Sequence, residues 1–183
     1  MAQILDLVGS TIIGGLVLLM ILTLNGYMEN TAGVQTMNLS TQENLTALVG
    51  MIEYDFAKMG YRVSDSLKIR VADSTRIVFK TDIDNNGVVD SISYSLDLVL
   101  YAATQNPRDR ILYRALNNGT STSINLGVTR FRLWYYDSLG NITTWRSKMR
   151  AVRLAIDLES TSSLDTVYTG ACWERTIKPK NLR

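Results

Sequence analysis

The first 28 residues are predominantly apolar. No charged residue occurs from Leu7 to Met28, and as an α-helix this stretch would span about 33 Å, enough for a hydrocarbon core of about 30 Å. The run 16–22 is apolar at every position, whereas a surface helix of a soluble domain carries only an apolar stripe. No Lys or Arg precedes Lys58, so the basic start of a cleaved secretory signal is missing. We predict a helix over 1–28 that spans a membrane or packs in a filament core.

From residue 29 to residue 60 the apolar positions recur at helical spacing, with acidic and basic residues between them. This pattern predicts an amphipathic continuation of the helix, whose apolar stripe packs on a downstream domain. Asn25-Gly26 and Ala32-Gly33 are soft points where a long helix could bend or break, and Gly60 is placed as a stop. The apolar positions are Leu39, Leu45, Leu48, Val49, Ile52, Phe56 and Met59.

Beyond Gly60 the pattern changes to the two-residue alternation of β-strands. Turn signals separate the strands at Asn117-Asn118-Gly119 and Leu139-Gly140-Asn141, and both prolines lie outside strand interiors. We therefore predict an antiparallel β domain over 61–183 and an α+β fold in which the long N-terminal helix packs on that sheet. The predicted strands cover 76–80, 91–96, 111–114, 128–136, 149–158 and 166–176.

Composition narrows the classes of function. A chain of 183 residues holds one domain and an appendage. The net charge is +2 and the basic residues are scattered singly, whereas a nucleic-acid partner requires a clustered basic surface; we predict no such partner. The absence of histidine and the single cysteine exclude Ser-His-Asp triads, Cys-His pairs and histidine-bearing zinc sites. Glu53 and Asp55 stand two residues apart on the predicted helix and point apart, so we predict that the protein is not an enzyme.

Cys172 has no second cysteine in the chain with which to form a disulfide. It could link two chains or act as a reactive thiol. The alternative, which we favour, is a small residue on a half-buried strand beside Trp173.

The segment between two predicted strands, 82–90, matches the first nine positions of a calcium-binding loop. Carboxylates, an amide and a backbone carbonyl are the oxygen ligands that calcium prefers, and closely spaced carboxylates would otherwise repel one another. Position 12, which carries a bidentate acid in such loops, is Ser93. The alternative is a solvated hairpin loop in which Asn86-Gly87 supplies positive φ. The sequence establishes no cofactor; calcium is the one for which it offers candidate ligands, and these are Asp82, Asp84, Asn86, Val88 (through its carbonyl) and Asp90.

Small residues cluster early in the apolar helix. Gly9, Gly14 and Gly15, together with Ser10 and Thr11, form a patch that allows close approach of another helix. Asp6 precedes this patch, where a carboxylate is stabilised by the positive end of the helix dipole. Taken alone, Asp6 fits equally well as a helix-start residue in the lipid head-group region.

The chain resembles type IV pilins and the pseudopilins of type II secretion, especially the larger minor subunits of the pilin-W and pseudopilin-J group. The apolar helix that runs into an amphipathic half and then a β domain is one shared feature, and the segment Leu48 to Tyr61 (LVGMIEYDFAKMGY) is another. The order of later motifs is the third. These motifs are an Asp-rich turn with glycine, a strand with Tyr94, the strand Leu112-Tyr113-Arg114 and a C-terminal Pro179-Lys180-Asn181-Leu182.

The resemblance implies a structural subunit that lies in a membrane before assembly and then packs its N-terminal helix among copies of itself or related subunits. Its β domain would be displayed outside the cytoplasm, on an extracellular or periplasmic filament. Pilins carry an acid as the fifth residue of the mature chain, thought to pair with a neighbour's amino terminus. Removal of Met1 before Ala2 would make Asp6 that residue. The chain departs from the family in showing no basic leader, no glutamate there and no helix-breaking proline in the apolar helix.

The alternative function is a solitary single-pass anchor that carries a binding or adhesion module. Trp134, Tyr135 and Tyr136 lie in a row and could form a contact surface on such a module, although the alternation of a strand accounts for at least two of them. The sequence leaves open whether the chain is a major or a minor filament subunit.

Overall fold

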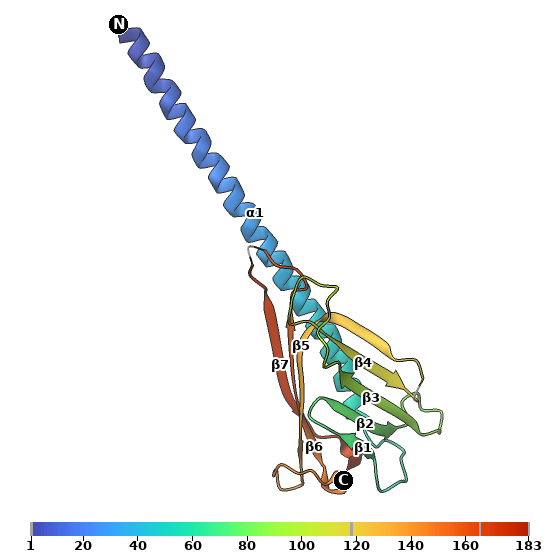
Figure 1. Ribbon diagram of the computed structural model, residues 1–183. Helices are drawn as coiled ribbons and strands as arrows, with labels where there is room; N and C mark the ends of the chain where they lie inside the picture. Colours follow the sequence, from blue (N-terminus) through green and yellow to red (C-terminus); the bar gives the residue numbers. More distant parts are fainter. Residues whose placement is uncertain (1, 118, 165, 183) are drawn as a thin grey trace. The chain divides into compact units, whose positions relative to one another are not determined.

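The computed structural model describes residues 2–117, 119–164 and 166–182 of the chain, and Figure 1 shows its elements in colour along the sequence. The described residues contain one long helix, α1 (Ala2–Ala57), followed by seven strands. The chain divides by its internal contacts into two compact units, residues 1–37 and residues 38–183.

The first unit consists of helix alone, since residues 2–37 all belong to α1. Its large aliphatic side chains are exposed, for example Ile13 at 63%, Leu19 at 60% and Met20 at 72%. Gly26 and Gly33, the expected soft points, both lie within α1. Among the described helices, α1 alone is long and apolar enough to cross a membrane.

The second unit begins with the last turns of α1, which carry the predicted apolar stripe. Leu48, Ile52 and Phe56 follow one another at four-residue intervals and are at most 1% exposed, as expected for one face of a helix that packs on a core. The helix ends at Ala57, three residues before the predicted stop. Gly60 has a φ of +77° and donates its N–H to the carbonyl of Lys80 at 2.9 Å, so it turns the chain back toward the sheet.

The sheet is a meander in which each strand pairs antiparallel with the next along the chain. The predicted α+β arrangement, a long helix packed on an antiparallel sheet, is therefore confirmed. The first strand was not predicted, because four residues that include Arg70 are too few for an alternation to stand out. The strands are β1 (Ile69–Ala72), β2 (Arg76–Thr81), β3 (Asp90–Leu96), β4 (Arg110–Leu116), β5 (Thr122–Tyr136), β6 (Ala151–Glu159) and β7 (Gly170–Ile177).

A cluster of aromatic rings lies at the centre of the core between the helix and the sheet. The ring of Phe56 meets those of Phe79 on β2 and Tyr94 on β3 edge to face, with centroids 5.5 and 5.8 Å apart. Tyr94 stacks on Phe131 of β5 at 6.4 Å. Because edge-to-face and offset pairs stabilise beyond their buried area, this cluster fixes the end of α1 against β2, β3 and β5.

A close approach between two strands requires glycine at residue 127. Gly127 lies in β5 with a φ of +81°, and a Cβ there would stand 2.0 Å from the carbonyl oxygen of Glu159 at the end of β6. The register of the two strands shifts nearby, between Val128 and Arg130. Glycine therefore permits the bulge with which this strand pair begins.

The predicted turns are found where the described residues reach them. Thr81 pairs with Asp90 across β2 and β3, so residues 82–89 form the predicted hairpin loop. Gly140 has a φ of +84° in the β5–β6 connection. Asn117 has a φ of 53° after β4, whereas Asn118 lies outside the described residues. Two short 3₁₀ turns complete the set of described elements: η1 (Arg146–Lys148) lies between β5 and β6, and η2 (Lys180–Leu182) follows β7.

Candidate functional site

The predicted assembly residues lie along the exposed first turns of α1. A Cβ added to Gly9, Gly14 or Gly15 would meet nothing within 4 Å. The neighbouring hydroxyls of Ser10 and Thr11 donate to the carbonyls of Leu7 and Val8, each at 2.9 Å. These hydroxyls therefore need no water, which is the condition for a polar side chain in an apolar setting.

Asp6 is exposed, and its carboxylate has no hydrogen bond or ion pair with another described residue. Met1 and the side chain of Ala2, the expected partner after removal of Met1, lie outside the described part of the chain. The carboxylate is thus available to a group from another molecule.

The acidic loop between β2 and β3 brings its three aspartates together. Oxygen atoms of Asp82, Asp84 and Asp90 all lie within 4.8 Å of one another. Asp84 is exposed, whereas Asp82 is 0% and Asp90 is 6% exposed. Gly87, at the sixth position, has a φ of +87°. The other positive φ is at Asn85, 63°, and not at Asn86 as the hairpin alternative expected.

Hydrogen bonds within the loop hold these oxygens in place. Asp84 accepts the backbone N–H of Asn86 at 3.1 Å, and Asn86 Oδ1 accepts that of Val88 at 2.7 Å. Asp90 Oδ2 accepts the N–H of Ile83 at 3.1 Å, while its Oδ1 accepts Nδ2 of Asn117 at 2.6 Å. The loop is therefore fastened to the turn after β4 as well as to its own strands.

Asp82 has a different environment for each of its oxygens. Its Oδ2 accepts Nη1 of Arg62 and the N–H of Gly87, both at 3.1 Å. Its Oδ1 is buried and has no donor among the described residues. Burial raises the pKa of Asp82, but the hydrogen bonds from Arg62 and Gly87 outweigh it and hold that pKa below its ordinary value. The group is a carboxylate at neutral pH. Arg62 was not predicted as its partner, because no local pattern links this residue to the loop.

The two acids near the end of α1 take different partners. Asp55 is 1% exposed and accepts hydrogen bonds from Tyr94 on β3 and Arg114 on β4. Glu53 accepts Nη1 of Arg175 on β7 at 2.5 Å. They point apart as predicted from their spacing, and each connects the helix to a different part of the sheet.

Another buried acid, which the sequence did not indicate, lies just before β4. Asp109 is 0% exposed; its Oδ2 accepts the hydroxyl of Thr104 at 2.7 Å, and its Oδ1 has no donor among the described residues. Burial and the nearby charge of Glu159 raise the pKa of Asp109 against the effect of the Thr104 hydroxyl. Glu159 in turn binds Arg108 at 2.9 Å. This cluster fastens the β3–β4 loop to the end of β6.

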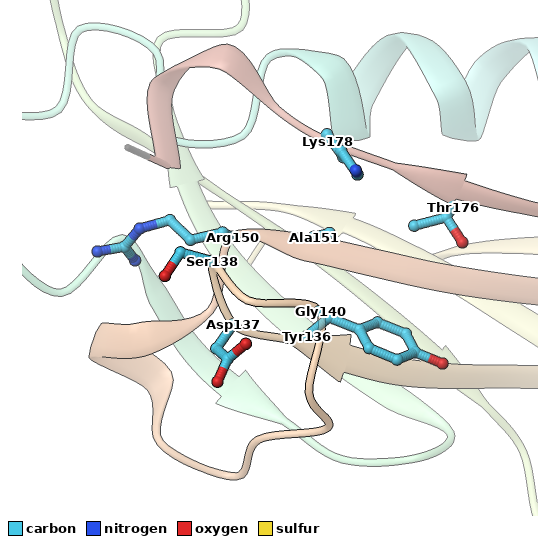
Figure 2. A pocket seen from close by; sticks show the side chains of 8 residues that line it. All are labelled: Tyr136, Asp137, Ser138, Gly140, Arg150, Ala151, Thr176 and Lys178. Carbon is cyan, nitrogen blue, oxygen red and sulfur yellow. The ribbon is translucent and has the colours of Figure 1, made fainter.

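A pocket of about 260 Å³ opens where β5, β6 and β7 meet the β5–β6 turn. Figure 2 shows Lys178 on one side of it and Asp137 on the other, with the ring of Tyr136 at one end. Asp137 Oδ1 accepts the N–H groups of Asn141 and Leu139, which hold the pKa of Asp137 below its usual value. Arg150 donates to two backbone carbonyls. The lining residues are Tyr136, Asp137, Ser138, Gly140, Arg150, Ala151, Thr176 and Lys178.

The aromatic row 134–136 alternates as a strand requires. Tyr135 is 6% exposed and donates its hydroxyl to the carbonyl of Asp73 at 2.8 Å. Trp134 faces the other side of the sheet, and the guanidinium groups of Arg132 and Arg153 lie 5.7 and 5.3 Å from the centre of its ring. The row is therefore not one continuous aromatic surface.

Cys172 lies beside Trp173 on β7, a half-buried strand as the favoured interpretation expected, and its own side chain is on the exposed face. It pairs across the strands with Asp157, whereas its neighbour Trp173 pairs with Ile156. Since paired residues of antiparallel strands share a face, Trp173 faces the core in which Ile156 is buried, and Cys172 faces solvent.

Comparisons of the chain with protein-family models, with curated proteins and with solved structures find no match. The resemblance to pilins thus stays a prediction from the sequence. Any function for this chain must be argued from its own exposed helix, acidic loop and pocket.

Proposed function

We propose that the chain is a structural subunit of a type IV pilus-like or pseudopilus filament. Its N-terminal helix would reside in a membrane before assembly and pack against the helices of sister subunits afterwards. The sheet-bearing unit would stand outside the cytoplasm and form the filament surface. The single observation that carries this proposal is the run of exposed aliphatic side chains on the charge-free stretch 7–28.

The energetic argument begins with those side chains. Leu16, Leu18 and Leu22 are each 57–59% exposed, and full burial of one aliphatic side chain contributes roughly 1.5–3 kcal/mol. A helix with such residues on all sides cannot stay in water as a monomer. Lipid tails are as apolar as leucine, so the same surface can leave the bilayer for a bundle of like helices without meeting water.

The small-residue patch supports a bundle over a lone anchor. Gly9, Gly14 and Gly15 leave the helix surface open, and small residues are the ones that let helix backbones approach closely in a membrane. A helix that contacted only lipid would gain nothing from them.

Asp6 also supports a helix bundle over a lone anchor. A carboxylate without a partner is costly in an apolar setting, and pairing it with a cation offsets part of that cost. The amino terminus of a neighbouring subunit is a cation that assembly itself would supply. In this proposal Asp6 therefore sets the axial position of one helix against the next.

A solitary membrane-anchored binding module is the second candidate. The pocket beside Tyr136 favours it, because it combines an aromatic ring, hydroxyl groups and the ammonium of Lys178, which has no hydrogen-bond partner among the described residues. Such a module would need no contact between helices.

Negative-stain microscopy of material sheared from cells that express the full chain separates the two functions. We expect filaments from the unmodified protein and their loss with Asp6→Ala or Asp6→Lys. Glu29→Ala is the matched control, since Glu29 is an exposed acid on the same helix beyond the charge-free stretch, and it should leave the filaments intact.

Membrane fractionation supplies the complementary measurement. The Asp6 variants should remain in the membrane, because their apolar stretch is unchanged. An unmodified protein that stays dispersed in the membrane and never forms filaments would contradict the assembly proposal and favour the anchored module.

A further inference from the structure

We propose that the loop between β2 and β3 binds one calcium ion, held by the carboxylates of Asp82, Asp84 and Asp90, the amide oxygen of Asn86 and the backbone carbonyl of Val88. This proposal concerns the sheet-bearing unit and does not depend on filament assembly.

The first argument is spacing. Calcium binds oxygens at about 2.3–2.6 Å, so two ligands on opposite sides of one ion stand about 5 Å apart. The three aspartates present oxygens within 4.8 Å of one another, which is close enough for all three to bind a single ion. Gly87 occupies the position at which calcium loops require a sharp turn, and it has a φ of +87°.

The second argument is an oxygen without a donor. Asp82 is fully buried, and its Oδ1 makes no hydrogen bond with any described residue, although burying a polar atom unpaired costs about 1–3 kcal/mol. Asp109 also buries an unpaired oxygen, but no cluster of three acids among the described residues includes it. Within that part of the chain, Asp82 alone combines an unpaired carboxylate oxygen with a set of neighbouring ligands.

The third argument is charge. Arg62 binds Oδ2 of Asp82, and Lys58 donates to the carbonyl of Ile83 at 2.7 Å. Within the described residues, Asp84 and Asp90 have no basic partner in salt-bridge distance. Asp90 is nevertheless buried, with only the neutral donors of Ile83 and Asn117. A divalent cation would neutralise both carboxylates at once and bind the oxygen that Arg62 leaves free.

The ligand set selects the metal and its affinity. All five ligands are oxygens, which excludes the nitrogen and sulfur preferences of zinc, and a flexible loop with several protein ligands suits calcium better than the strict octahedron of magnesium. Ser93 cannot supply the bidentate carboxylate of high-affinity loops. We therefore expect a dissociation constant on the order of 10⁻⁴–10⁻³ M, as in extracellular calcium modules.

The test is isothermal titration of CaCl₂ into the full chain in detergent micelles, after treatment with a chelator, together with thermal unfolding. We expect one ion per chain, a higher Tm in about 10 mM CaCl₂, well above that dissociation constant, and at least tenfold weaker binding of MgCl₂. Asp84→Asn should weaken calcium binding at least tenfold without unfolding the protein, because Asp84 is exposed and, among the described residues, its carboxylate bonds only to Asn86.

Asp97→Asn is the matched control. Asp97 accepts the N–H of the residue two positions ahead, Val99, at 3.0 Å, as Asp84 does with Asn86, but it lies outside the loop; its variant should bind calcium within twofold of the unmodified chain. The absence of both binding heat and a Tm shift at about 10 mM CaCl₂ would overturn the proposal. Calcium binding that Asp84→Asn leaves unchanged would overturn it too, since the ion would then sit elsewhere.

Discussion

The hydroxyl of Tyr94 donates a 2.6 Å hydrogen bond to Oδ2 of Asp55, inside the core where α1 meets the sheet. Nε of Arg114 reaches the same oxygen at 2.8 Å. Burial and the adjacent Asp55 charge raise the pKa of Tyr94 above its usual value, so its proton stays in the hydrogen bond at any physiological pH. This cluster joins the helix to β3 and β4 by one charged contact.

Arg114→Met should destabilise the sheet-bearing unit by about 3 kcal/mol, because it leaves the carboxylate of Asp55 buried without its cation. The measurement is chemical unfolding of the detergent-solubilised chain followed by circular dichroism. Arg130→Met is the control: Arg130 pairs with Asp157 on the surface, where its side chain is 52% exposed, and such pairs contribute about 0–1 kcal/mol. Equal losses in the two variants would show that the buried pair has no special role.

Gly127→Ala should cost about 2–5 kcal/mol, the sum of a left-handed backbone for alanine and a steric conflict with Glu159. Gly140→Ala tests the backbone term alone, since its φ of +84° is similar but a Cβ there meets nothing within 4 Å. It should cost only about 1–2 kcal/mol. Unfolding midpoints of the two variants give the comparison, and a Gly140→Ala loss as large as that of Gly127→Ala would remove the role assigned to the close approach.

Asp109→Asn should make the protein more stable than the unmodified chain at neutral pH. The folded pKa of Asp109 lies above the ordinary value of about 3.9. Between these two values the folded state binds more protons than the unfolded state, so the free energy of unfolding falls as pH rises. The variant lacks this decrease. Its free energy of unfolding should therefore exceed that of the unmodified chain by an amount that grows as pH rises from about 4.

Asp137→Asn is the opposite case and serves as the control for that pH series. The pKa of Asp137 is lowered by the N–H of Asn141, so its stabilising effect is present above the ordinary pKa and is lost as pH falls through the folded value. This variant should be less stable than the unmodified chain at neutral pH and approach it in acid. Parallel pH profiles for the two variants would contradict both assignments.

Cys172 should react with a maleimide in the folded chain, with one label per molecule, because its side chain is exposed on β7. The rate should fall within a few-fold of that in denaturant, and Cys172→Ser should take no label. Mass spectrometry counts the labels. Resistance of the folded, monomeric chain to labelling would contradict the exposed position of this thiol.

Local pattern was sufficient for much of this fold. The charge-free stretch 7–28 defines the apolar helix, the stripe that contains Leu48, Ile52 and Phe56 defines its packed end, and two-residue alternation located six of the seven strands. Each of these features depends on neighbouring residues alone, and therefore a single sequence contains it. The three acids of the β2–β3 loop were predicted to share one turn for the same reason, since they lie within nine consecutive residues between two alternating runs.

Partners far apart in the chain were decided only by the tertiary structure. Asp55 contacts Tyr94 and Arg114 at separations of 39 and 59 residues, and Arg62, in the turn that follows α1, contacts Asp82 at a separation of 20 residues. The contacts of Asp55 depend on strand register and on which face a strand residue presents, and a shift of one residue reverses that face. For the same reason Cys172 proved exposed: periodicity located its strand, but pairing with β6 decided which side faces solvent.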